Sequence, residues 1–270
     1  MSSWSKHPRI HFIWIPIVLI AVLGILYSSP GLPKLDWERD NPIRQVPDFS
    51  VYKDVNQKKE AFFTFLYPVI EQENRHLLNI RRQLLQLAEQ EDWSLSEREW
   101  LKRLRALYLN DAEGALKQED ITRLLRRVDI IPPSLVLAQA AIESAWGTSR
   151  FARQGNNLFG QWCFEKGCGL VPRQRADGKH HEVARFDSVN ESVQAYLRNL
   201  NAFRAYKQLR DARLKARKNE QALTGSQLVV GLAQYSEQGD AYLRKVSNVI
   251  KQNQLERFDD QQRETLLASR

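Results

Sequence analysis

The sequence predicts a mainly helical α+β fold with a small β lobe, preceded by an N-terminal membrane helix and a helical extension. Helical stretches with apolar side chains about every three to four residues flank residues 151–187, where glycine, asparagine, proline and paired histidines break that spacing. An uncharged apolar run lies near the start of the chain. The 270 residues, 43% hydrophobic and 27% charged, suffice for a folded domain with appendages.

The N-terminal segment, residues 1–27, predicts export. Lys6, His7 and Arg9 precede a stretch without charge that reaches the lower edge of the length needed to cross a bilayer. An uncleaved anchor is favoured because no A-x-A-like site follows, and a cleaved secretory signal is the alternative. The rest of the chain is then expected in the periplasm, either anchored to the bacterial inner membrane or free.

Two segments separate this run from the main domain. Residues 28–50 contain four prolines and predict an extended spacer. Residues 51–131 predict a helical extension, in which Pro68 should kink or split the first long helix. Further along, Ser96 and Glu99 have the spacing of a capping box.

The main domain is predicted at residues 132–256. Pro132 and Pro133 suit the first turn of its opening helix. Short strands are expected in "LFGQWCF", "GLVPRQR" and "HEVARF", and helices resume afterwards. Residues 257–270 are interpreted as a C-terminal tail. A run of basic residues is interpreted as a solvated helix face: Arg210, Arg213, Lys215, Arg217 and Lys218.

The net charge of +8 predicts an anionic partner. Nucleic acid, a membrane surface and an acidic cell-wall polymer all fit that charge. Export argues against nucleic acid, and the apolar N-terminal segment provides for contact with the membrane. No protein partner is indicated.

The two cysteines, Cys163 and Cys168, stand alone in the sequence, without a second pair to complete a zinc site. A small disulfide loop in an oxidising compartment and two buried thiols both stay open. A metal site at His180, His181 and Glu182 is rejected because adjacent strand residues point to opposite faces. The expectation is therefore no metal and no cofactor.

Glu143 is the residue most suggestive of chemistry. It lies in the last predicted turn of the helix that starts at Pro132, among alanine, leucine, isoleucine and tryptophan. The negative end of a helix and apolar neighbours both raise the pKa of a carboxyl group. A carboxyl that stays protonated near neutral pH is what a general acid in glycosidic cleavage requires. The alternative is a glutamate that faces solvent or pairs with Arg150.

The stretch "AIESAWGTSRFARQGNNLFGQW" resembles the glucosaminidase, lysozyme-like family of peptidoglycan hydrolases, glycoside hydrolase family 73. The resemblance rests on residues 140–147, on Ser149 and on "NNLFG" at residues 156–160. The chain is similar to the Bax-type branch of that family through "PDFSVYKDV" and "KKEAFFTFLYP" within residues 47–68 and through residues 156–173. The domain-level likeness covers about residues 132–253, and the Bax-type likeness nearly everything after the anchor.

The resemblance implies a lysozyme-like fold and hydrolysis of the β-1,4 bond after N-acetylglucosamine in peptidoglycan. Glu143 falls on the family's general acid. Glu182 falls on its second glutamate, which activates water or stabilises charge at the anomeric carbon, although "ARFD" replaces the commoner order after it. A plain surface glutamate is the alternative for Glu182. Tyr242 falls near the cleaved bond, with Tyr235 beside it, although "YSEQGDAYLRKV" lacks the usual Asp-Pro.

Asn157, Phe159 and Trp162 are candidates for a sugar groove, because aromatic faces stack on pyranose rings and amides bond hydroxyls. A packed strand core is the alternative for the two aromatic residues. Carboxylate chemistry on a glycan needs no cofactor. A membrane-tethered module that binds or scaffolds peptidoglycan without cutting it is the competing function. Muramidase specificity, and a retaining, inverting or substrate-assisted mechanism, all stay open; amidase activity is not expected.

Overall fold

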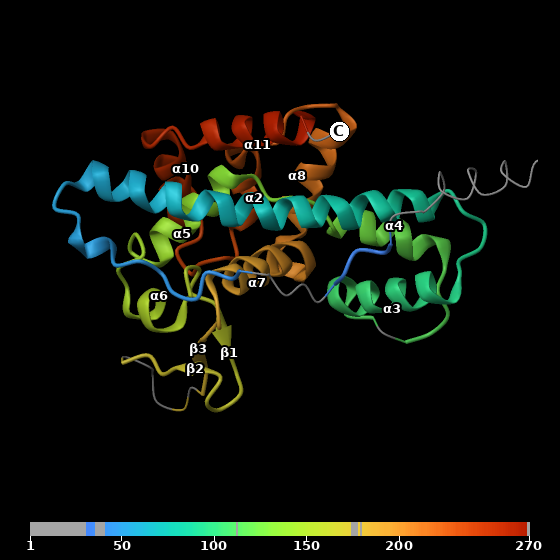
Figure 1. Ribbon diagram of the computed structural model, residues 1–270, viewed down its shortest axis with the longest axis horizontal. Coiled ribbons are helices and arrows are strands. Elements are labelled where there is room, and N and C mark those ends of the chain that lie inside the picture. The colour runs from blue at the N-terminus through green and yellow to red at the C-terminus, as the bar shows by residue number, and fades with distance from the viewer. Residues whose placement is uncertain (1–30, 36–40, 112, 174–177, 179, 269–270) are drawn as a thin grey trace, which may run out of the picture. The chain divides into compact units, whose positions relative to one another are not determined.

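The computed structural model describes residues 31–35, 41–111, 113–173, 178 and 180–268, and Pro33–Arg270 form one compact unit. Helices and one small sheet build that unit (Figure 1), which confirms the mainly helical fold with a β lobe. The predicted membrane segment lies outside the described residues. Within them, no helix combines the length and apolar character needed to cross a bilayer.

The elements follow one another along the chain as a helical half, a β lobe and a second helical half. The first half contains η1 (Phe49–Val51), α2 (Val55–Ala88), α3 (Leu95–Leu109), α4 (Gln118–Arg127), α5 (Pro133–Glu143) and α6 (Arg150–Gly155). The lobe contains β1 (Trp162–Cys163), β2 (Gly169–Leu170) and β3 (Glu182–Ala184). The second half contains α7 (Val189–Ala202), η2 (Arg204–Tyr206), α8 (Lys207–Lys218), α9 (Gly225–Leu228), η3 (Val229–Leu232), α10 (Asp240–Gln252) and α11 (Glu256–Ala268).

The sequence predicts a kink or a split at Pro68; helix α2 is continuous through this residue, so the split is wrong. Pro68 lies inside the helix, and buried aromatic and aliphatic side chains on both sides of it pack into the core. Tertiary packing therefore outweighs the loss of one backbone hydrogen bond. The capping box of α3 is formed by Ser94 and Glu97, two residues before the predicted pair.

The described part of the predicted spacer packs on the domain. Val46 and Phe49 are buried, and the Val46 N–H donates to Asn156 Oδ1 at 3.2 Å. Ile43 exchanges further hydrogen bonds with the start of α7, at Val189 and Asn190. Residues 43–49 of the predicted spacer therefore lie against the domain.

The three strands form an antiparallel sheet in the order β1-β3-β2. Cys163 pairs with Glu182, and Gly169 pairs with Ala184. All three fall inside the segments predicted to form strands, but they are only two or three residues long. The lobe therefore depends on side-chain contacts as well as on its ladder of hydrogen bonds.

Two arginines of the basic run are buried, so its interpretation as a solvated face is wrong for them. Arg210 and Arg213 are 5% and 2% exposed. Arg213 donates to the carbonyls of Arg127 and Ile130, near the end of α4, where helix carbonyls lack partners of their own. The described residues of the predicted tail belong to α11, whose Asp259 accepts a hydrogen bond from the Ser134 N–H.

Candidate active site

Glu143 lies in the last turn of α5, as the sequence predicts, and is the last residue of that helix. The preceding residues of the helix, from Pro133 to Ala141, are all buried, while Glu143 itself is half-buried. Burial raises the pKa of the Glu143 carboxyl, and a hydrogen bond from Tyr242 and the charge of Lys245 offset part of this effect. The carboxyl is therefore biased towards its protonated form.

The chain turns sharply directly after Glu143. Ala145, Trp146 and Gly147 all have positive φ, at 51°, 60° and 75°. Such values are strained for alanine and tryptophan and are typical of functional sites. The Ser144 hydroxyl stabilises the turn, since it donates to the Ala140 carbonyl at 2.6 Å and accepts from the Gly147 N–H at 2.8 Å.

A buried hydrogen-bond chain leads from the core to Glu143. The Tyr196 hydroxyl donates to Gln139 Oε1 at 2.6 Å, and Gln139 Nε2 donates to Tyr242 Oη at 2.9 Å. Tyr242 Oη then donates to Glu143 Oε1 at 2.7 Å. Because Gln139 supplies the proton for its bond to Tyr242, the Tyr242 proton is directed at Glu143.

Tyrosine rings form one wall beside this chain. Tyr235 stacks on Tyr242 with ring centroids 5.5 Å apart, and Tyr196 stacks on Phe159 at 4.0 Å. The Tyr235 hydroxyl donates to the Phe159 carbonyl at 2.8 Å. Tyr235 therefore ties the loop after α6 to the tyrosine that contacts Glu143, as well as lying next to Tyr242 as predicted.

The loop after α6 does not present its predicted sugar contacts to solvent. Asn157 and Phe159 are each 1% exposed. Asn157 Nδ2 donates to the carbonyls of Gln161 and Ala184, at 2.8 and 2.9 Å, so its amide holds the loop against β3. The Phe159 ring is covered by Tyr196. The predicted sugar contact is therefore wrong for Asn157, whereas Phe159 takes up the alternative of a packed core.

Gly160 of this loop lies next to the acid. Its φ is +66°, and a Cβ added to it would lie 3.5 Å from Glu143 Oε2. The absence of a side chain at this position leaves the second carboxylate oxygen uncovered on that side. Oε1 of Glu143 thus accepts a hydrogen bond from Tyr242, and Oε2 lies beside Gly160, where no side chain covers it.

Glu182 lies buried in the β lobe. Its Oε1 accepts from the Gly167 N–H at 3.0 Å and its Oε2 from the Gly169 N–H at 2.8 Å. Cys163 and Cys168 form the disulfide that closes the same loop. Both contacts hold the β1–β2 connection in place, and a catalytic role for Glu182 stays a prediction.

One group of potential metal ligands occurs among the described residues, namely Cys163, Cys168 and Glu182. The disulfide occupies both sulfur atoms, so the group lacks the thiolates that a zinc site of this composition needs.

Trp162, on β1, is 58% exposed and stacks on His181 at 4.2 Å. Its free face is consistent with the predicted sugar contact.

Gln139, Tyr196 and Lys245 were not predicted from the sequence. Gln139 had a usable signal, since it is a polar residue four positions before Glu143 in an apolar helix, and so lies on the same face. Lys245 lies three positions after Tyr242 on α10, which places it on the face of Tyr242. Tyr196 had no such signal, because it continues the apolar stripe of α7.

Comparisons with known proteins show what the chain is similar to. The glucosaminidase family model, described as mannosyl-glycoprotein endo-beta-N-acetylglucosaminidase, matches residues 118–255. Protein bax of Escherichia coli (strain K12) is 36% identical over 209 residues, covering 77% of this chain and 74% of that protein. The catalytic domain of the autolysin Auto from Listeria monocytogenes is 20% identical, with a TM-score of 0.36 over 64% of this chain and 92% of that domain. The family match spans more than half of the chain, and the chain belongs to the glucosaminidase family.

Proposed function

We propose that this protein is an exported peptidoglycan hydrolase that cleaves the β-1,4 bond after N-acetylglucosamine. Membership of the glucosaminidase family supports a glycosidase. The observation that carries the proposal is Glu143, a half-buried carboxyl whose pKa is raised by burial and which a buried tyrosine holds in one position. The peptidoglycan substrate rests on the resemblance of residues 140–160 to peptidoglycan-cleaving members of the family.

Glu143 is the proton donor of the proposed reaction. Because its Oε1 accepts the Tyr242 hydrogen bond, the acidic proton is carried by Oε2, the oxygen beside Gly160. The glycosidic oxygen is expected to approach from that side and to take up the proton as the bond to the anomeric carbon breaks. Tyr242 then stabilises the carboxylate that is left behind, since a hydrogen bond to an ionised group strengthens.

Positive charge that develops at the anomeric carbon needs a second group. Glu182 fills this role if the β lobe moves and releases the carboxylate from the Gly167 and Gly169 N–H groups. The substrate's own N-acetyl oxygen fills it in a substrate-assisted mechanism. Trp162, exposed on β1, is proposed to stack on a sugar ring of the bound strand.

The proposed site of action is the periplasm. Residues 1–27 are proposed to anchor the chain in the inner membrane, with a cleaved signal as the alternative. The net charge of +8 favours residence close to the anionic cell envelope.

Release of soluble muropeptides from purified sacculi tests the proposal. Wild type is expected to release them, and Glu143→Gln to release almost none, because glutamine keeps the shape of the side chain without an acidic proton. Equal release by both proteins contradicts the assignment of Glu143. Binding to sacculi without release by wild type supports the non-catalytic module instead.

Borohydride reduction of the products tests the linkage. Reduced glucosamine is expected at the new ends. Reduced muramic acid places the enzyme in the muramidase class and contradicts the proposed specificity.

A further inference from the structure

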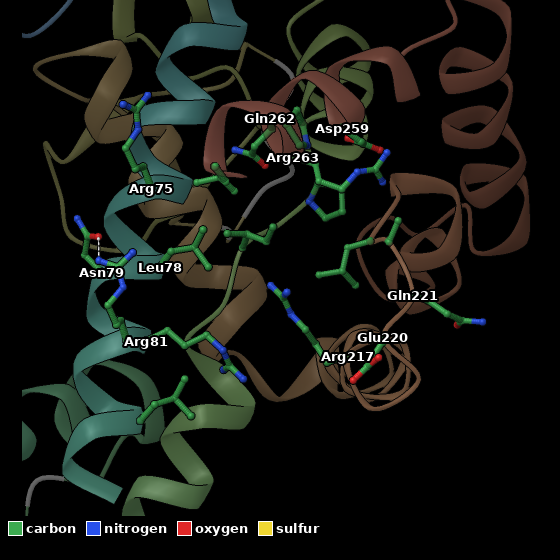
Figure 2. Close-up of a pocket in the computed structure, with 18 residues that line it drawn as sticks. Arg75, Leu78, Asn79, Arg81, Arg217, Glu220, Gln221, Asp259, Gln262 and Arg263 are labelled. Atoms are coloured by element: carbon green, nitrogen blue, oxygen red, sulfur yellow. Dashed lines mark hydrogen bonds between the residues drawn. The ribbon is translucent and has the colours of Figure 1, made fainter. Parts of the chain in front are cut away.

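One cavity in the described part of the chain lies away from Glu143. It has a volume of about 940 Å³ and is bounded by α2, the segment before α5, the α8–α9 connection and α11 (Figure 2). This volume falls within the range of small-ligand sites, roughly 300–1,000 Å³. None of Glu143, Tyr242 or the β-lobe residues lines the cavity.

Apolar side chains line much of this cavity. Leu78 and Leu85 of α2 contribute to it from one side, and Leu223 from the α8–α9 connection. Leu85 is 49% exposed, although it is a large aliphatic residue on a long, well-packed helix. A bound apolar ligand would remove the exposed surface of Leu85 from water.

The cavity is also lined by cationic side chains. Its charged lining consists of five arginines and two acids: Arg75, Arg81, Arg82, Arg217, Arg263, Glu220 and Asp259. Asp259 is engaged with protein donors, since it accepts from the Ser134 hydroxyl at 2.6 Å and from the Gly225 N–H at 3.1 Å. Glu220 lies on the exposed α8–α9 connection. Arg75 is paired with Glu71 of the same helix, at 3.0 Å, and the other four arginines outnumber the two acids of the lining.

Positive charge from α2 and α8 is concentrated around Asp129, which lies between α4 and α5. The carboxylate of Asp129 is shared by three guanidinium groups, with N–O distances of 3.8 Å to Arg81, 3.9 Å to Arg213 and 2.7 Å to Arg217. Arg81 also donates to the Val128 carbonyl at 3.0 Å, just after α4, so the carbonyls at that helix end offset part of the charge. One carboxylate and a helix end leave this cluster with an excess of positive charge.

Two arginines of the lining are available to a ligand. Among the described residues, Arg82 hydrogen-bonds only the Asn79 side chain, at 3.3 Å. Arg263 pairs with Asp260, at 2.8 Å, on the half-exposed surface of α11, where an ion pair is weak and exchangeable. Guanidinium groups bind phosphate and carboxylate oxygens through paired N–H donors.

We propose that this cavity binds a small anionic amphiphile, with a phosphate or carboxylate head against the arginines and an apolar chain over Leu78, Leu85 and Leu223. The anionic head group would neutralise part of the excess positive charge, and the apolar tail of the ligand would cover the three leucine side chains. The inference does not depend on the proposed function, because the cavity shares no lining residue with the Glu143 site.

Calorimetric titration of the full chain with octyl phosphate, below its aggregation concentration, tests the proposal. Inorganic phosphate supplies the head alone, and octanol supplies the chain alone. We expect one octyl phosphate per chain, bound at least about tenfold more tightly than either half, with affinity that falls as salt rises. Binding no tighter than octanol, or equal to inorganic phosphate, overturns the proposal.

Substitutions of arginines test whether octyl phosphate binds in this cavity. Arg82→Gln combined with Arg263→Gln is expected to weaken octyl phosphate about tenfold, because two charged donors are lost. Arg257→Gln is the matched control, since Arg257 also makes a surface ion pair from α11, with Glu60. Unchanged affinity in the double variant, or an equal loss in the control, contradicts the site. Glu143→Gln should bind octyl phosphate as wild type does, which separates this test from that of the enzyme.

Discussion

Tyr242→Phe tests whether the buried hydrogen-bond chain controls the acid. The change removes one oxygen atom and leaves the ring that stacks on Tyr235. Two hydrogen bonds disappear with it, the 2.9 Å bond from Gln139 and the 2.7 Å bond to Glu143. The variant is therefore expected to change both stability and the pH dependence of activity.

The loss of stability follows from the burial of Gln139. Its side chain is fully buried, so the Nε2–H that served Tyr242 is left without an acceptor. An unsatisfied buried donor costs about 1–3 kcal/mol. For a chain of this size each kcal/mol corresponds to about 2–4 °C in Tm, so a fall of about 2–12 °C is expected in thermal unfolding.

The pH dependence follows from the protonation of Glu143. A general acid loses activity as pH rises through its pKa, and the Tyr242 hydroxyl lowers the pKa of Glu143 because it stabilises the carboxylate. Tyr242→Phe therefore raises the pKa and moves the alkaline limb of muropeptide release to higher pH. Tyr206→Phe is the control, since its hydroxyl bonds Asn199 within the same tyrosine cluster. A limb that stays in place, or that Tyr206→Phe moves as far, refutes the reasoning.

Four other changes probe the site and its support. Lys245→Met should move the same alkaline limb upwards in a pH–activity profile, because the charge of Lys245 lowers the pKa of Glu143. Gly160→Ala should lower muropeptide release while the variant is folded, since it adds a methyl 3.5 Å from Glu143 Oε2, and its positive φ should cost about 1–2 kcal/mol in denaturant unfolding. Burial raises the pKa of Asp259 from 3.8 to about 6, so the chain takes up a proton when it folds. As pH rises from 3.8 to 6, the free energy of unfolding of wild type should therefore fall by about 3 kcal/mol relative to that of Asp259→Asn, measured by denaturant unfolding. Glu182→Gln should lower unfolding free energy by about 1–3 kcal/mol, because an NH₂ group then faces a backbone N–H; an unchanged Tm contradicts this role.

The sequence was most informative where the signal is local. A carboxylate in the last turn of an apolar helix is visible in one short stretch, and the structure places Glu143 there. The hydrogen-bond chain that leads to Glu143 is not local in sequence, because Gln139 and Tyr242 are separated by 103 residues and Gln139 and Tyr196 by 57. The position of Tyr242 was expected only from a family resemblance, since spacing along one helix cannot bring α5, α7 and α10 together.

Residue type alone misled the predictions for the loop and for α8. Asn157 and Phe159 suit a sugar groove by chemistry, but a loop has no period that says which side chains face inwards. Arg210 and Arg213 have the spacing of a solvated face, and their burial depends on carbonyls that other helices supply. A guanidinium group can satisfy several such carbonyls, which makes a buried arginine compatible with a basic surface pattern.

The two glutamates have opposite environments, and this contrast bears on the mechanism. One carboxylate oxygen of Glu143 lies beside Gly160, which has no side chain to cover it, whereas both oxygens of Glu182 accept hydrogen bonds from N–H groups of the loop. Glu182 is only 6% exposed, so it can activate water only if the β lobe opens to admit that water. If it does so, Glu182→Gln should lose about 10²–10⁴-fold in muropeptide release per folded molecule. If its work is to hold the loop, release per folded molecule should stay near that of wild type, and the N-acetyl group of the substrate is then the remaining partner for Glu143.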